Sequence, residues 1–95
     1  MANVEHVYKQ ISAFAQEAGA QRVVLFGSRA RGNARPKSDI DLAIEGCPNP
    51  ALFEDRLQND LWSLLRIDLV NLDEPVSDDL RAEIARDGVI LYEKA

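Results

Sequence analysis

The residues best suited to chemistry lie in two short clusters, each at the end of an apolar run. Gly27 and Ser28 end the run at residues 23–26, and Asp39 and Asp41 begin the next one. Glycine lets the backbone approach an anion closely, and the free N–H groups of the Ser-Arg-Ala-Arg turn that begins at Ser28 favour phosphate. The first cluster therefore has the chemistry of one half of a nucleotide site.

The second cluster has the ligand chemistry of a divalent cation. Side chains two positions apart in a strand point the same way, so Asp39 and Asp41 project from one face while Ile40 and Leu42 project from the other. Neighbouring carboxylates repel each other unless a cation lies between them, and hard oxygen ligands suit Mg²⁺ or Mn²⁺. Together the two clusters predict a phosphate-binding turn beside a metal site.

Basic residues gather around this turn although the whole chain is acidic. Acidic residues outnumber basic ones sixteen to eleven, and the net charge is −5. Nonspecific binding to nucleic acid needs a basic surface, so this balance disfavours it. Arg29 and Arg31 are candidates to neutralise phosphate charge, and the sequence does not choose between them. Arg31, which precedes Gly32, equally suits a structural role.

These two clusters and the Arg31-Gly32 pair between them resemble the signature of the nucleotidyltransferase superfamily that includes polymerase β. The spacing and the short chain are most similar to the minimal members, the MNT proteins encoded beside HEPN-domain proteins. The resemblance implies an α+β fold and an enzyme that transfers a nucleotide from ATP. It also implies that Gly27 and Ser28 hold the β- and γ-phosphates.

A third carboxylate matches a further position of this family. Asp68 lies between Ile67 and Leu69, where a buried acid needs a partner, and an ion pair with Arg66 would supply one. In nucleotidyltransferases of this kind, however, a third carboxylate on a later strand faces the Asp-x-Asp pair, and Asp68 matches it. The resemblance thus implies two Mg²⁺ ions held by Asp39, Asp41 and Asp68.

The resemblance further implies a partner and a reaction. MNT proteins are antitoxins that transfer AMP from ATP to a tyrosine hydroxyl of a HEPN RNase toxin and release pyrophosphate. Larger relatives carry an added domain that holds the acceptor, whereas only residues 93–95 follow the last predicted strand here. We therefore expect another protein, or another copy of this one, to deliver the acceptor group.

Other functions remain compatible with some of these residues. A non-catalytic antitoxin would mask its partner by contact and keep nucleotide binding as a regulatory or vestigial feature, with Trp62 and Leu52 at the interface. An enzyme acting on a small hydroxylated compound would need a separate subunit to hold it. A polymerase would need a basic track for a primer and template, which the acidic remainder of the chain does not offer.

Helices are expected in three segments where apolar residues recur at i, i+3 and i+4. They cover residues 4–18, 50–65 and 78–87, and Asn49 and Ser77 are the expected N-caps of the last two. The last helix is expected to turn Leu80, Ile84 and Ala85 inward.

Strands are expected in the β-rich segments, and 66–71 is placed in the centre of the sheet because it is nearly continuously apolar. The order of elements predicts one α+β domain over residues 1–95, with about four strands in a mixed sheet and helices mainly on one side. The four predicted strands cover residues 22–26, 39–45, 66–71 and 89–92.

Composition excludes several other classes. The sequence has no apolar run near the ~20 residues that cross a bilayer and no signal-peptide start, so we expect a cytoplasmic protein. Cys47 is the single cysteine, which rules out an internal disulfide, and the single histidine, His6, lies far from it in sequence. A catalytic thiol is therefore not expected.

Overall fold

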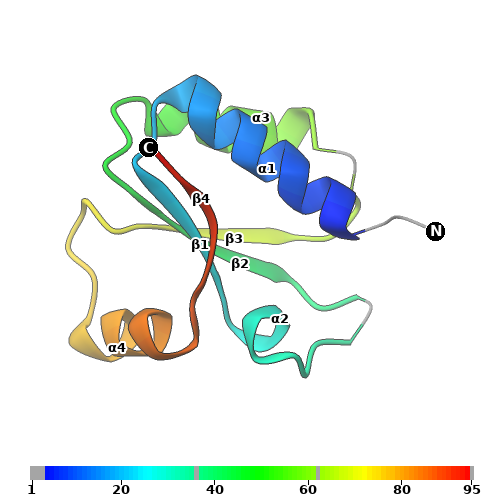
Figure 1. Cartoon of the computed structure of the whole chain (residues 1–95), viewed down its shortest axis with the longest axis vertical. Coiled ribbons are helices and arrows are strands. Elements are labelled where there is room, and N and C mark those ends of the chain that lie inside the picture. Colours follow the sequence, from blue (N-terminus) through cyan, green and yellow to red (C-terminus); the bar gives the residue numbers. More distant parts are fainter. Residues whose placement is uncertain (1–3, 36, 62, 95) are drawn as a thin grey trace.

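The computed structural model describes residues 4–35, 37–61 and 63–94, so the interpretation of Trp62 lies outside the described residues. Helices and strands alternate along the chain (Figure 1), because the turn after β1 contains a short helix. The elements are α1 (Val4–Ala18), β1 (Arg22–Phe26), α2 (Ser28–Arg31), β2 (Ile40–Glu45), α3 (Pro50–Asn59), β3 (Ile67–Asn71), α4 (Asp78–Asp87) and β4 (Val89–Glu93).

The four strands form one mixed sheet in the order β3-β2-β1-β4. β1 is antiparallel to both β2 and β4, whereas β2 and β3 are parallel. The prediction that β3 is central was wrong, because β3 is an edge strand. Its continuous apolar character arises because both of its faces are covered: Ile67 and Leu69 pack on one side of the sheet and Val70 on the other.

Helices cover the sheet unequally. Figure 1 shows α1 and α3 side by side on one face, while α4 lies across the other. The α1/α3 face holds the larger apolar cluster, with Phe53 fully buried at its centre. The α4 face holds a smaller cluster of four buried residues, Val24, Phe26, Ala43 and Ile84. Two layers of unequal depth therefore sandwich the sheet, and most helical cover is on one side as predicted.

Both predicted N-caps are present. The Asn49 side chain accepts a hydrogen bond from the backbone N–H of Leu52 at 3.3 Å, and that of Ser77 accepts one from Leu80 at 3.2 Å. Such bonds satisfy N–H groups that have no partner within the helix. Of the residues predicted to face inward from α4, Ile84 is buried and Leu80 is half-buried, but Ala85 is exposed.

The third helix is shorter than predicted. α3 ends at Asn59 instead of residue 65, and residues 60–61 and 63–66 belong to no helix or strand. Leu61 and Leu65 still pack against the larger cluster, but Leu64 is fully exposed. The apolar spacing continues past the helix end because Leu61 and Leu65 are partly buried without being helical, so periodicity alone placed the end of the helix too late.

No helix in the described ranges is both long enough and apolar enough to cross a membrane. The free Cys47 is buried, and its sulfur lies 3.8 Å from the carbonyl oxygen of Ala18. His6 is exposed on α1. Cys47 follows the end of β2, whereas Asp39 and Asp41 lie at its start.

Candidate functional site

The predicted turn and the first carboxylate meet where β1 ends and β2 begins. Phe26 pairs with Asp41 across these antiparallel strands, so Gly27 follows directly beside the Asp41 side chain. A Cβ on Gly27 would collide with Oδ2 of Asp41 and lie 3.0 Å from its Cγ. The φ angle of Gly27 is +74°, a conformation that other residues adopt only with strain. Both observations require glycine at this position.

The short helix α2 begins at Ser28, with Gly27 as its N-cap and Gly32 as its C-cap. Gly27 has no side chain with which to bind the first-turn N–H groups, and the backbone N–H of Arg31 donates to the carbonyl of Gly27 at 3.1 Å. The structure therefore places the predicted small-residue turn directly against the carboxylate of Asp41.

The third predicted acid lies beside the first pair. Asp68 of β3 is in register with Asp41 of β2, and parallel strands in register direct such side chains to the same face. Oδ1 of Asp68 also lies 3.5 Å from Nε of Arg66. The ion pair and the proximity to Asp41 thus coexist. Asp39 lies just before β2 and is exposed.

The charges of these carboxylates act on one another. Burial raises the pKa of Asp41 above its ordinary value, and the negative charges of Asp68, Asp39 and Glu83 raise it further, while Arg31 acts in the opposite direction. Glu83 belongs to α4 and was not singled out from the sequence. Glu83 is far from Asp41 in sequence, and only the packing of α4 on this face brings the two carboxylates near each other.

The three predicted acids do not form a ready-made metal centre. Within the described ranges, no group of three or more histidine, cysteine or acidic side chains is gathered closely enough to hold an ion. The chemistry of the donors nevertheless fits Mg²⁺ or Mn²⁺, because hard carboxylate oxygens of Asp39, Asp41 and Asp68 lie on one side of the sheet and repel each other. A divalent cation would relieve that repulsion.

Both arginines predicted near the phosphates contact protein groups. Arg29 donates from Nε at 3.1 Å and from Nη2 at 2.8 Å to the carbonyl oxygen of Ser38, the residue before Asp39. Nη1 of Arg31 lies 3.6 Å from Asp87 and 3.9 Å from Glu83. Arg29 thus ties the turn to the loop that precedes Asp39, and Arg31 links the turn to α4, which agrees with the structural alternative for Arg31.

Two cavities lie away from the acids. One, of about 400 Å³, opens on the α4 face at the far ends of β1 and β2, where Arg22 pairs with Glu45. The other, of about 390 Å³, lies between α3 and β3 and includes Glu54 and Glu74 in its wall. Asp39, Asp41 and Asp68 line neither of them. They lie at the opposite end of the sheet, on its α4 face.

Comparisons with known proteins identify a family. The model of the family described as polymerase beta, nucleotidyltransferase matches residues 9–95. A solved structure described as a candidate minimal nucleotidyltransferase is 30% identical, with a TM-score of 0.70 and an alignment that covers 90% of each chain. Among curated protein sequences, none matches this chain.

Two solved toxin–antitoxin complexes contain chains of the same fold. A chain of a toxin–antitoxin complex with AMP-PNP is 23% identical, with a TM-score of 0.73, and the alignment covers 92% of this chain and 73% of that one. A chain from the complex of a tri-AMPylated Shewanella oneidensis HEPN toxin with MNT antitoxin is also 23% identical, with a TM-score of 0.68 and coverage of 95% and 72%. At this identity, the similarity shows a shared fold.

Proposed function

The chain belongs to the polymerase beta nucleotidyltransferase family, and on that premise we propose that it transfers AMP from ATP to a hydroxyl group of a partner protein. The proposed partner is a HEPN-domain toxin, the proposed acceptor is a tyrosine, and the modification makes this chain an antitoxin. The observation that carries the proposal is the meeting of the turn at Gly27 with Asp41, which is itself in register with Asp68.

The proposed reaction exchanges one bond to phosphorus for another. The acceptor oxygen bonds to the α-phosphorus of ATP, the bond from that phosphorus to the β-phosphate oxygen breaks, and pyrophosphate leaves. The hydroxyl proton is released, and a tyrosine with a pKa near ~10 loses it more readily than a serine. Bound Mg²⁺ supplies charge neutralisation for the triphosphate and lowers the pKa of the attacking hydroxyl.

The residues of this chain have distinct roles in that proposal. Asp39, Asp41 and Asp68 hold the metal ions, and Gly27 and Ser28 bind the β- and γ-phosphates through backbone N–H groups. Arg29 keeps the loop that ends at Ser38 against the turn, through its two hydrogen bonds to one carbonyl oxygen. It therefore positions Asp39 in this proposal.

The proposed partner is supported by the proteins in which similar chains occur. One such chain belongs to a complex that contains a tri-AMPylated HEPN toxin, and another to a toxin–antitoxin complex with AMP-PNP. The exposed position of Asp39 and the half-exposed position of Asp68 leave the acids accessible to a group on a second protein.

Intact-mass analysis tests the transfer directly. The protein is incubated with a candidate HEPN-domain partner, with ATP and with Mg²⁺, and the mass of that partner is measured. We expect gains in whole AMP units that disappear in the Asp39→Asn/Asp41→Asn double variant and in EDTA. The matched control is Glu54→Gln/Asp55→Asn, which removes the same charge from exposed positions on α3 and should transfer as the wild type does.

Two results would contradict the proposal. If the double variant transfers AMP at the wild-type rate, the assignment of Asp39 and Asp41 to the metal site is wrong. If the wild type forms a stable complex but adds no mass, the chain acts instead as a non-catalytic antitoxin that neutralises its partner by binding.

A further inference from the structure

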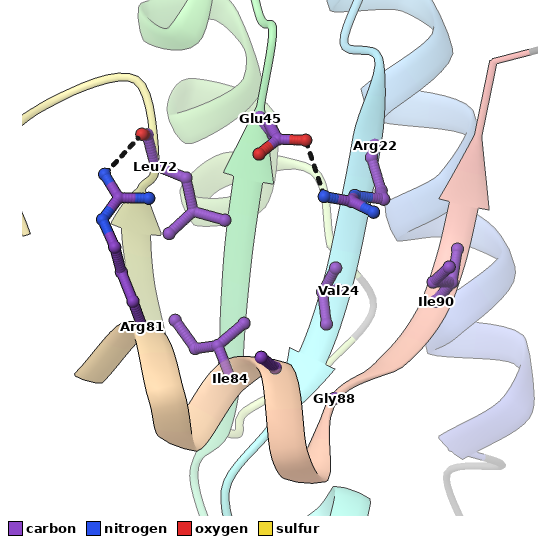
Figure 2. A pocket seen from close by; sticks show the side chains of 9 residues that line it. Arg22, Val24, Glu45, Leu72, Arg81, Ile84, Gly88 and Ile90 are labelled. Carbon is purple, nitrogen blue, oxygen red and sulfur yellow. Dashed lines mark hydrogen bonds and ion pairs between the residues drawn. The ribbon is translucent and has the colours of Figure 1, made fainter. Parts of the chain in front are cut away.

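The α4 face of the sheet carries a pocket that the proposed transfer does not use. Its volume is about 400 Å³, which lies within the ~300–1,000 Å³ typical of small-ligand sites. Figure 2 shows the strands behind the pocket and α4 along one side of it. The apolar part of the lining comes from β1, α4, β4 and the residue after β3, and consists of Val24, Ile84, Ala85, Ile90 and Leu72.

Polar groups line the pocket at two places. Nη2 of Arg22 pairs with Oε1 of Glu45 at 2.7 Å, as the dashed line in Figure 2 marks. Nε of Arg22 is buried but has no hydrogen-bond partner among the described residues. Because this atom is closed off from solvent, a ligand in the pocket does not reach it, and the Arg22–Glu45 pair forms a polar edge of the pocket.

The second polar group is Arg81 of α4. Its Nη2 donates to the carbonyl oxygens of Leu72 at 3.0 Å and Glu74 at 3.3 Å, which holds the guanidinium at the edge of the pocket. With Arg22 and Glu45, the lining has two positive charges and one negative charge. The pocket is therefore locally positive on a chain whose net charge is −5.

These features select a class of ligand. We propose that the pocket binds a small organic anion with an apolar body, specifically a carboxylate on an aromatic or aliphatic skeleton. The apolar body would lie mainly over Ile90, which is 51% exposed and would become partly buried, beside Val24 and Ile84, which are already buried. The carboxylate would lie at Arg81, where a charge-assisted hydrogen bond is available.

The same helix connects this pocket to the acidic end of the sheet. Arg81 and Ile84 of α4 line the pocket, while Glu83 and Asp87 of the same helix face Arg31. A ligand in the pocket would therefore contact the element that holds the turn. The binding itself does not depend on the proposed transfer, because none of the metal-binding candidates lines the pocket.

Binding can be tested with 3-phenylpropionate as the probe, followed through backbone amide shifts in nitrogen-15 NMR spectra of the full chain. We expect saturable shifts centred on Val24, Ile84 and Ile90, and at least tenfold weaker binding of the uncharged analogue 3-phenylpropanamide. The second cavity is an internal control, because Glu54 and Glu74 in its wall should repel the carboxylate. The absence of saturable shifts up to about 10 mM probe would overturn the proposal, because the dissociation constant would then be too weak for a specific site.

Variants distinguish binding in the pocket from nonspecific binding of the probe. Arg81→Gln should weaken 3-phenylpropionate binding about tenfold or more. Arg56→Gln removes the same charge from α3, where Arg56 pairs with Asp60 and Glu17, and should leave binding unchanged. Ile90→Ser, at a half-exposed site, keeps the test decisive if Arg81→Gln unfolds the chain. Wild-type affinity in Ile90→Ser, or in a folded Arg81→Gln, would overturn the proposal.

Discussion

One face of the sheet holds most of the buried core, and the other carries the candidate functional residues. The α1/α3 face contains all six of the largest fully buried side chains, Phe53, Ile11, Ile40, Leu42, Ile44 and Val23. Among the described residues, the α4 face has four buried apolar side chains, together with the predicted acids at one end and an open pocket at the other. The difference indicates that the first face holds the fold together while the second leaves room for ligands.

Strand β2 shows how one segment serves both faces. Ile40 and Leu42 are completely buried in the α1/α3 cluster, whereas Asp41 between them faces α4. Because side chains alternate, burial of the two apolar residues determines where the carboxylate points. A slip of the register by one residue would bury Asp41 in the core, so the packing of one face stabilises the orientation of the site on the other.

The largest expected effect on stability comes from the α1/α3 face. Phe53→Ala removes the side chain at the centre of the larger cluster, and a buried phenylalanine truncation costs about 3–5 kcal/mol in the free energy of unfolding because a cavity remains. Urea denaturation would measure this loss. A cost below about 1 kcal/mol would show that the α1/α3 face does not dominate stability.

A smaller cost is expected on the α4 face. Ile84→Ala should lower the free energy of unfolding by about 2 kcal/mol, the lower end of the range for such truncations. Ile84 already borders an open pocket, so its removal creates little new enclosed cavity. The same urea experiment would measure it. If Ile84→Ala proves as costly as Phe53→Ala, the two faces contribute equally.

Much of this arrangement was readable from local sequence signals. Glycine followed by serine after an apolar run predicted the turn, and alternation predicted that Asp39 and Asp41 share a face. The N-caps at Asn49 and Ser77 followed from residue type and were confirmed. These features depend on neighbours in sequence, which is why they can be predicted without knowledge of the packing.

Features that depend on distant neighbours were missed or placed incorrectly. β3 was predicted to be central because both of its faces are apolar, although residues 67–71 form an edge strand. The proximity of Glu83 to Asp41 and the pairing of Arg31 with Asp87 require the position of α4 against the turn. The pocket beside Arg81 likewise forms only when four separate elements meet. No spacing within a single segment encodes such contacts.

The stability lost on removing an N-cap should be the same for a helix on either face of the sheet. Asn49→Ala at α3 and Ser77→Ala at α4 each remove one side-chain hydrogen bond to a backbone N–H, which costs about 1 kcal/mol. Thermal unfolding of the two single variants would compare them. Nearly equal costs would show that the two faces differ in packing and not in capping. A much larger cost at Asn49 would show that the N-terminus of α3 is coupled to the larger apolar cluster.

The smallest expected effect has the opposite sign. Asp41 has a raised pKa in the folded chain, caused first by burial and then by the charges of Asp68, Asp39 and Glu83. Its contribution to stability is therefore full below its unfolded pKa of ~3.9 and is lost as the pH rises through the folded pKa. In metal-free buffer at pH 7, Asp41→Asn should raise the free energy of unfolding by less than about 1 kcal/mol, the usual range for partly exposed charges.

Urea titrations from about pH 3 to pH 7 would test this sign, because the gain should shrink once Asp41 is protonated in both states. Asp55→Asn, at an exposed position on α3, is the matched control and should show no such gain. Added Mg²⁺ should stabilise the wild type more than Asp41→Asn, since a ligand that binds only the folded state raises its stability. If Asp41→Asn instead lowers the free energy of unfolding at pH 7 without metal, Arg31 outweighs burial and repulsion at this carboxylate.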